Sequence, residues 1–198
     1  VIDWPSRTLP LEHRPMSAID TLLNRNSHAR LVDPGPDEAE LNTILQAALR
    51  APDHGRLRPW RFVVVAGDRR QALGDVFVRS LRLKGVDDTA KLEKAANAPL
   101  RAPLIIAGLL HAVAHPKIAR EEQAHAVAAA LSAAQLAAEA LGIGSMWRTG
   151  AYATDPSVIE SLGGAVDDQV IGFLYLGTRE GPQKLRPVEP LDTFVSYF

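Results

Sequence analysis

The sequence predicts an α+β domain in which a mixed central sheet is flanked by helices. Three short runs rich in Val, Leu and Ile have the length and composition of buried strands, at residues 62–66, 104–110 and 170–176. Helical patterns outnumber these runs, and the two kinds of element do not alternate regularly along the chain. Helices gathered around a sheet in this way are typical of the α+β class.

Two helices are expected before the first strand. Ser17 is placed to cap a helix that runs into Arg25 and carries an apolar face of Ile19, Leu22 and Leu23. After a Pro-Gly-Pro break, Asp37 caps a second helix with apolar residues at helical spacing, and Pro52 stops it.

The later helices are less uniform. A helix over residues 69–83 follows the first strand, and a weaker one covers residues 87–97. The dominant helix spans residues 120–141, and ten of the eighteen residues from 124 to 141 are alanine. A helix that is small and apolar on nearly every side belongs in the centre of a fold or across a dimer interface. Gly142 ends it.

Residues 142–150 are interpreted as a glycine-punctuated loop or a short strand. A small helix is expected between Asp155 and the glycine pair at 163–164, before the third strand and a charged loop over residues 179–192. The chain closes with Phe194, Val195, Tyr197 and Phe198. Because so aromatic a segment is rarely a loose tail, we expect it to be docked.

Composition excludes several classes of function. The formal net charge is -1 and the basic residues are scattered, so no overall field attracts nucleic acid or an anionic membrane. The absence of cysteine excludes disulfides, thiolate metal sites and a cysteine nucleophile. The longest apolar stretch is interrupted by polar residues, and no secretory signal is visible, so we expect a cytoplasmic protein without a membrane span. Residues 1–15 are interpreted as an N-terminal extension and residues 16–198 as a single domain.

Familiar catalytic and metal motifs are missing. Gly142 and Gly144 lack the third glycine of a dinucleotide fingerprint and follow a helix instead of a strand. The P-loop and the G-x-S-x-G motif are absent. His111, His115 and His125 have no neighbouring carboxylate set, so they are interpreted as surface or capping histidines and not as metal ligands.

Three polar segments are candidates for a binding site, each with a structural alternative. Arg25, Asn26 and Ser27 at the end of the first helix either cap it or bind an anion. Residues 50–58 place His and Arg in a loop between two rigid elements, where binding sites are commonly built. Trp147, followed by Arg148 and Thr149, is by default a core residue, but this segment also suits presentation of backbone N–H groups to a planar ligand.

Together these segments resemble the FMN-dependent nitroreductase family, in its small branch of NAD(P)H nitroreductases. The similar stretches read LLNRNSHARL at 22–31, LRAPDHGRLRPWRFVVV at 49–65, GIGSMWRTGA at 142–151, IGFLYLGT at 171–178 and FVSYF at 194–198. They occur in the order of the family and cover nearly everything after residue 16.

The resemblance implies a homodimer with two FMN sites at its interface, each built from both subunits. It implies that hydride passes from NADH or NADPH through FMN to nitroaromatic or quinone-like acceptors by a ping-pong mechanism. Because the flavin carries this chemistry, no protein side chain is expected to act as the catalytic group.

The resemblance also implies roles for individual residues. It places Arg25, Asn26 and Ser27 at the flavin phosphate, ribityl chain and pyrimidine edge, and Arg50 and His54 on the partner subunit that closes the site. Trp147, Arg148 and Thr149 fall near the reactive face, and Lys184 and Arg186 near the phosphate. Beside the path of the nicotinamide nucleotide fall Ala137, Ala138, Glu139, Ala140, Leu141 and Gly142.

Two departures and two alternatives accompany the resemblance. Relatives often carry a second arginine where this chain has Asn26, which weakens FMN binding only if the side chain makes the contact. Ala29 is apolar where some members place a polar residue. A non-enzymatic flavin carrier or sensor on the same fold is the first alternative, and a specialised flavin dehydrogenase is the second.

Overall fold

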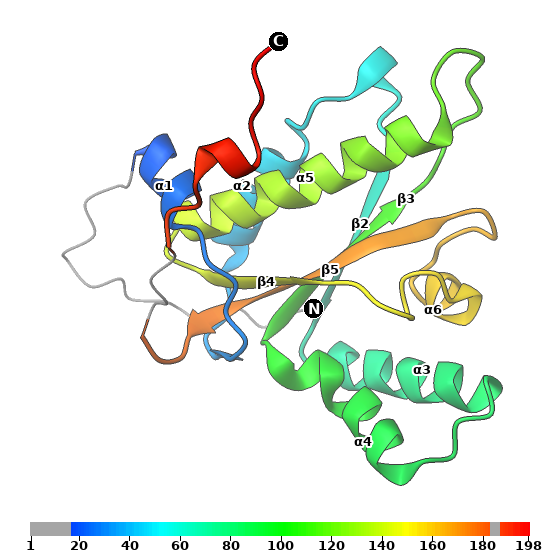
Figure 1. Cartoon of the computed structure of the whole chain (residues 1–198). Helices are drawn as coiled ribbons and strands as arrows, with labels where there is room; N and C mark the ends of the chain where they lie inside the picture. Colours follow the sequence, from blue (N-terminus) through cyan, green and yellow to red (C-terminus); the bar gives the residue numbers. More distant parts are fainter. Residues whose placement is uncertain (1–16, 183–186) are drawn as a thin grey trace.

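The computed structural model describes residues 17–182 and 187–198, and its strands form one sheet (Figure 1). The strand order is β1-β5-β3-β2, and β4 also pairs with β5. The strands are β1 Leu31–Val32, β2 Trp60–Ala66, β3 Leu104–Leu110, β4 Gly144–Arg148 and β5 Gln169–Arg179. The α+β class is confirmed, but every pairing among the described strands is antiparallel, which corrects the expectation of a mixed sheet. Apolar runs reveal where strands lie but not their direction.

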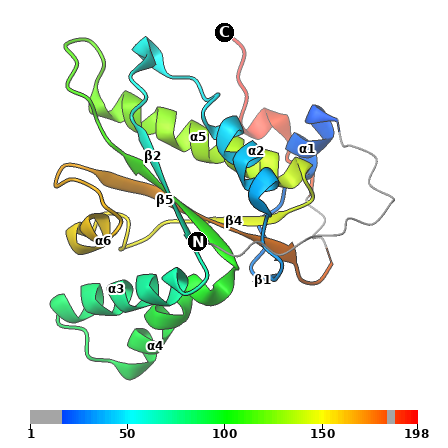
Figure 2. The ribbon, with the colours of Figure 1, turned by 180° about the vertical axis from the view of Figure 1, so that it is seen from behind.

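Helices cover both faces of the sheet (Figures 1 and 2). One face carries α1 Ala18–Asn24, α2 Glu38–Ala48 and α5 Arg120–Ala140. The other carries α3 Arg69–Leu83, α4 Thr89–Asn97 and α6 Pro156–Ser161. Three single-turn helices, η1 His54–Arg56, η2 Ala98–Arg101 and η3 Leu191–Thr193, complete the described elements.

Strand β3 lies at the centre of the sheet and separates two apolar cores. Ile106 and Leu110 belong to the core under α5, whereas Ile105 and Leu109 belong to the core under α3 and α6. All seven residues of β3 are buried. Because helices cover both of its faces, the strand reads as a continuous apolar run and not as an alternating one.

Helix α5 is buried along one side and open along the other. Val127, Ala130, Leu131 and Ala134 face the core, whereas Ser132 and Ala140 are exposed. The helix ends where Gly142 takes a φ of 75°, and the N–H of Ile143 then bonds the carbonyl of Ala138 at 2.8 Å. None of the described helices is both long and apolar enough to cross a membrane.

Two further expectations are resolved. The choice between loop and strand after Gly142 goes to the strand, since β4 pairs with β5 over five residues. The terminal aromatic segment, in contrast, is not docked on its own chain: Phe194 is 72% exposed and Tyr197 is 95% exposed. Aromatic composition indicates burial but does not say against which surface. Residues 1–15 lie outside the described part of the chain.

Asp155 joins α6 to α3. Its carboxylate caps α6 through Ser157, accepts a hydrogen bond from Ser80 Oγ at 2.6 Å and lies 2.5 Å from Lys84 Nζ. Burial by itself raises the pKa of Asp155, but the hydrogen bonds from Lys84, Ser157 and Ser80 outweigh it and hold the pKa well below 3.8. The carboxylate therefore stabilises the fold only while it is ionised.

Replacement of this carboxylate tests the junction. Asp155→Asn should reduce the free energy of unfolding at pH 7 by about 2–4 kcal/mol, because Lys84 loses its buried partner. A depressed pKa contributes stability above the ordinary value of 3.8 and loses it below, so the deficit should shrink as the pH falls through 4. Urea denaturation measures both effects. Asp87→Asn, at an exposed position, is the control, and equal losses in the two variants would contradict this role.

Candidate functional site

Residues 25–27, called here the arginine segment, leave α1 and run between the end of α5 and the edge of β4. The backbone of Asn26 lies close enough to the Glu139 carboxylate on α5 to lower the pKa of that group. Two residues later, the N–H of His28 donates to the Ser145 carbonyl on β4 at 2.8 Å. The segment therefore lies against α5 on one side and is hydrogen-bonded to β4 on the other.

Glu139 lies beneath the arginine segment and is 1% exposed. One carboxylate oxygen is 2.9 Å from Arg179 Nη2 at the end of β5. Burial raises the pKa of Glu139, and the charges of Arg179 and Arg25 oppose that rise. The charges of two guanidinium groups thus act on one carboxylate, and the remaining positive charge suits an anion such as a phosphate.

The side chains of the arginine segment point in different directions. Asn26 is 5% exposed, and its Nδ2 donates to the Asn24 carbonyl at 3.1 Å. The Asn26 amide is therefore turned inward. The contact with Glu139 is made by the Asn26 backbone, so it does not need the arginine side chain that relatives often carry at this position. Arg25 is half-buried, and its Nη1 lies 3.4 Å from Ser27 Oγ.

The backbone of β4 offers hydrogen-bonding groups at its outer edge. The Ser145 carbonyl bonds His28, so Ser145 directs its backbone away from β5. Backbone groups alternate in direction along an antiparallel strand, so the N–H and C=O of Trp147 also point to this edge. No loop or turn backbone bond within the described part of the chain reaches them.

The side chains of this strand divide between the two faces. Trp147 packs against the α5 core, as predicted for a core residue. Its indole nitrogen is buried without a hydrogen-bond partner in the described structure. A Cβ on Gly172 would overlap the indole, so only glycine fits beneath it. Arg148 points to the opposite face, with its guanidinium 5.4 Å from the Tyr175 ring centroid. Thr149 is exposed after the strand ends.

Arg50 and His54 form the second group of predicted site residues. Arg50 is exposed at the end of α2, and His54 is exposed in η1. His54 Nδ1 lies 2.5 Å from Glu122 Oε1, in the first turn of α5. Glu122 therefore holds the loop that carries His54, a role that the sequence pattern does not reveal.

The two groups lie at opposite ends of α5 (Figures 1 and 2). The arginine segment contacts Glu139, whereas His54 contacts Glu122, seventeen residues earlier on the same helix. At 1.5 Å per residue these contacts are about 25 Å apart. A single tricyclic ring is far too short to bridge that distance, so one chain does not bring the two groups to a common ligand.

The residues expected beside a nicotinamide nucleotide differ in accessibility. The side chains of Ala138 and Glu139 are buried in the single chain. Ala140 is exposed, while Ala137, Leu141 and Gly142 are half-buried. Lys184 and Arg186 lie outside the described residues. Sequence reasoning missed Arg179, although a lone carboxylate in an alanine-rich helix signals that a cation must meet it.

Histidines do not form a metal site within the described ranges. His111 Nδ1 lies 2.9 Å from Asp168 Oδ1, an ion pair when the imidazole is protonated. No group of three His, Cys, Asp or Glu residues suited to a metal ion occurs among the described residues.

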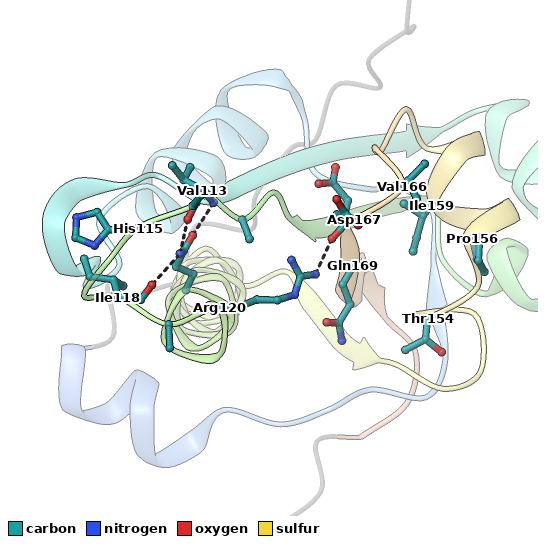
Figure 3. Close-up of a pocket in the computed structure, with 15 residues that line it drawn as sticks. Val113, His115, Ile118, Arg120, Thr154, Pro156, Ile159, Val166, Asp167 and Gln169 are labelled. Carbon is teal, nitrogen blue, oxygen red and sulfur yellow. Dashed lines mark hydrogen bonds between the residues drawn. The ribbon is translucent and has the colours of Figure 1, made fainter.

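A cavity of about 770 Å³ lies between the start of α5, the loop before it and the segment around α6 (Figure 3). Its polar groups are largely engaged with one another. Arg120 donates to the Asp167 carbonyl at 2.7 Å, and the Gln123 amide bonds both backbone groups of Val113. None of the predicted cofactor residues lines it.

Comparison with known proteins places these features in context. The model of the nitroreductase family matches residues 22–178. An Escherichia coli (strain K12) protein named "Putative NAD(P)H nitroreductase YdjA" is 41% identical over 92% of this chain and 100% of its own. A Haemophilus influenzae protein named "Putative NAD(P)H nitroreductase" is 32% identical over the same shares.

Solved structures share the fold. The nitroreductase-like family protein from Bacillus cereus has a TM-score of 0.80 at 21% identity and covers 94% of this chain and 98% of its own. A nitroreductase with bound FMN from Bacteroides fragilis has a TM-score of 0.71 at 22% identity, over 92% of this chain and 99% of its own.

The buried pair beneath the arginine segment gives a pH-dependent prediction. Arg179→Met should cost about 3 kcal/mol at pH 7, because Glu139 loses its cation in the interior. The pKa of Glu139, already raised, should rise further. A raised carboxyl pKa favours the fold at low pH, so the deficit should grow as the pH rises above 4.5.

Urea denaturation across that pH range measures this deficit. Arg30→Met is the control, since Arg30 is exposed and its ion pair with Glu180, at 3.9 Å, is a weak surface pair. A loss in Arg179→Met that does not change with pH would contradict the buried pair.

Proposed function

We propose that this chain, which belongs to the nitroreductase family, is an FMN-dependent NAD(P)H oxidoreductase that acts as a homodimer. A nitroaromatic or quinone-like compound would accept the electrons in a ping-pong reaction. The names of the relatives and the bound FMN of one structural neighbour support this proposal. The observation that carries it is the placement of two cationic groups at opposite ends of α5, each of which would form half of a site.

The arginine segment and the β4 edge fit a bound flavin. Arg25 and Ser27 would hold the anionic and polar parts of FMN, with the Arg25 charge stabilised by Glu139 below it. The outward N–H of Trp147 would donate to the ring system. Bound FMN would supply the redox chemistry, taking a hydride from NADH or NADPH and passing both electrons to the acceptor.

The side chains of the proposed site would orient the flavin and stabilise its charge. Arg25 would offset the negative charge that a reduced flavin carries, which favours reduction. Because the buried side chain of the neighbouring Asn26 is hydrogen-bonded to the Asn24 carbonyl, Arg25 would be positioned before any ligand arrives. Arg50 and His54 of a second copy would cover the open side of the ring. No protein side chain has to form or break a bond.

A second copy would have an exposed apolar surface to bind. Large apolar residues are exposed on α1, on the end of α2 and along the terminal segment, and η3 lies near α1 in both views (Figures 1 and 2). They are Ile19, Leu22, Leu23, Leu49, Phe194, Val195, Tyr197 and Phe198. Exposed apolar patches of this kind mark protein interfaces. The small residues on the open side of α5 would allow close approach of two helices.

The cofactor assignment is tested by purification. The protein should be yellow and should oxidise NADH or NADPH when a nitroaromatic is added. Arg25→Ala should weaken FMN binding by about tenfold, because one charge-assisted contact is lost. Flavin released per chain on denaturation measures this, with Arg30→Ala as the matched control.

Three outcomes separate the alternatives. Protein that takes up no FMN would sink the proposal. Bound FMN that no nicotinamide nucleotide reduces would favour a carrier or sensor. Unchanged retention in Arg25→Ala would remove Arg25 from the site.

The dimer is tested by a charge placed on α1. Leu23 is 74% exposed, so Leu23→Asp should fold normally and yet abolish dimers, since the carboxylate would be buried at the interface. Sedimentation should show dimers for the unaltered chain and monomers for the variant, with loss of bound flavin. Val166→Asp, at a residue that is 98% exposed, should leave the dimer intact. A monomeric unaltered chain would contradict the proposal.

A further inference from the structure

A second cavity, of about 400 Å³, lies on the side of the sheet opposite α5 and is called here the aromatic cavity. Helices α3 and α4 and strands β4 and β5 enclose it. One wall is the stacked pair of Phe77 and Tyr152, whose ring centroids are 3.9 Å apart with an interplanar angle of 7°. Its volume is within the range of pockets that hold small organic molecules.

The charged residues that line the aromatic cavity are all cations. Lys91, Lys94, Arg101 and Arg148 line it, and no carboxylate does. Among the described residues, none of these four side chains makes an ion pair with an acidic group. The cavity of Figure 3 differs in this respect, because its arginine and amide groups bond to neighbouring backbone.

Of the four cations, Arg148 is the least exposed to solvent. The lack of a negative partner therefore costs it the most free energy. Its Nε is buried and has no hydrogen-bond partner in the described structure. Burial, and then the charge of Arg101, lowers the pKa of Arg148, which means that its charge is under-compensated. Burial raises the pKa of Tyr175 to about 12, so its hydroxyl stays neutral and adds no negative charge near the guanidinium, which lies over the Tyr175 ring.

We propose that the aromatic cavity binds a compact planar anion, specifically an aromatic carboxylate. The carboxylate would compensate Arg148 and Arg101, and the ring would lie against the apolar aromatic walls. Arginine presents a planar fork that matches a carboxylate. Inorganic phosphate has no surface for the rings to bury, and a neutral arene would leave the cations uncompensated. The aromatic cavity is distinct from the proposed flavin site: Arg148 and Thr149, which the family resemblance places near the flavin, line this cavity in the structure.

The test uses 1-naphthoate and its neutral counterpart 1-naphthamide with the purified full chain saturated with FMN. Calorimetric titration should give one naphthoate per chain, and the amide should bind at least tenfold more weakly. Arg101→Gln and Lys94→Gln should each weaken naphthoate about five- to tenfold, since both residues are on the surface and tolerate exchange. Arg82→Gln removes the same charge from α3 outside the cavity and should have no effect.

Raising the salt concentration should weaken naphthoate more than the amide, because the attraction is electrostatic. Equal binding of the two compounds, or no naphthoate binding at millimolar concentration, would overturn the proposal. If Arg82→Gln weakened naphthoate as much as Arg101→Gln, binding would depend on the overall charge of the protein and not on the aromatic cavity, which would also overturn the proposal. Loss of binding in Arg25→Ala with no loss in Arg101→Gln would place the anion at the arginine segment instead, and would also overturn it.

Discussion

A carboxylate buried at the end of an alanine-rich helix organises the candidate site. Burial raises the pKa of Glu139, and the charges of Arg179, 2.9 Å away, and of Arg25 oppose that rise. These contacts tie the end of α5 to β5 and to the segment that carries Arg25. The position of Arg25 therefore follows from the need to satisfy one buried charge, before any ligand is considered.

Helix α5 also sets the distance between the arginine segment and the loop that carries His54. Glu139 anchors the arginine segment at one end, and Glu122 holds His54 at the other. The small side chains between them leave an open strip on a helix whose other side is packed against the sheet. Under the proposed function, this spacing and the open strip favour a second copy, and not a rearrangement of one chain, as the source of the other group.

Sequence patterns predict the elements whose signal is local. The strand at 104–110 and the long helix stand out because continuous burial and helical spacing are written in consecutive residues. Strand direction, the two-residue β1 and the pairing of Glu139 with Arg179 depend on segments far apart in sequence, and no local pattern reveals them. The exposed terminal aromatic residues are a similar case. Their composition predicts that they pack against a surface but does not say which one. The arginine segment was recognised through family resemblance, and only the structure shows that the Asn26 amide turns inward.

Complementation between two defective chains tests the shared site most directly. One tagged chain carries Arg25→Ala, and a differently tagged chain carries Arg50→Ala with His54→Ala; the mixed dimer is purified through both tags. If each site takes residues from both copies, the mixed dimer has one intact site and should bind one FMN, while each parent homodimer binds little. If each site lay within one chain, every site in the mixed dimer would be defective, and a mixed dimer as empty as its parents would contradict the account.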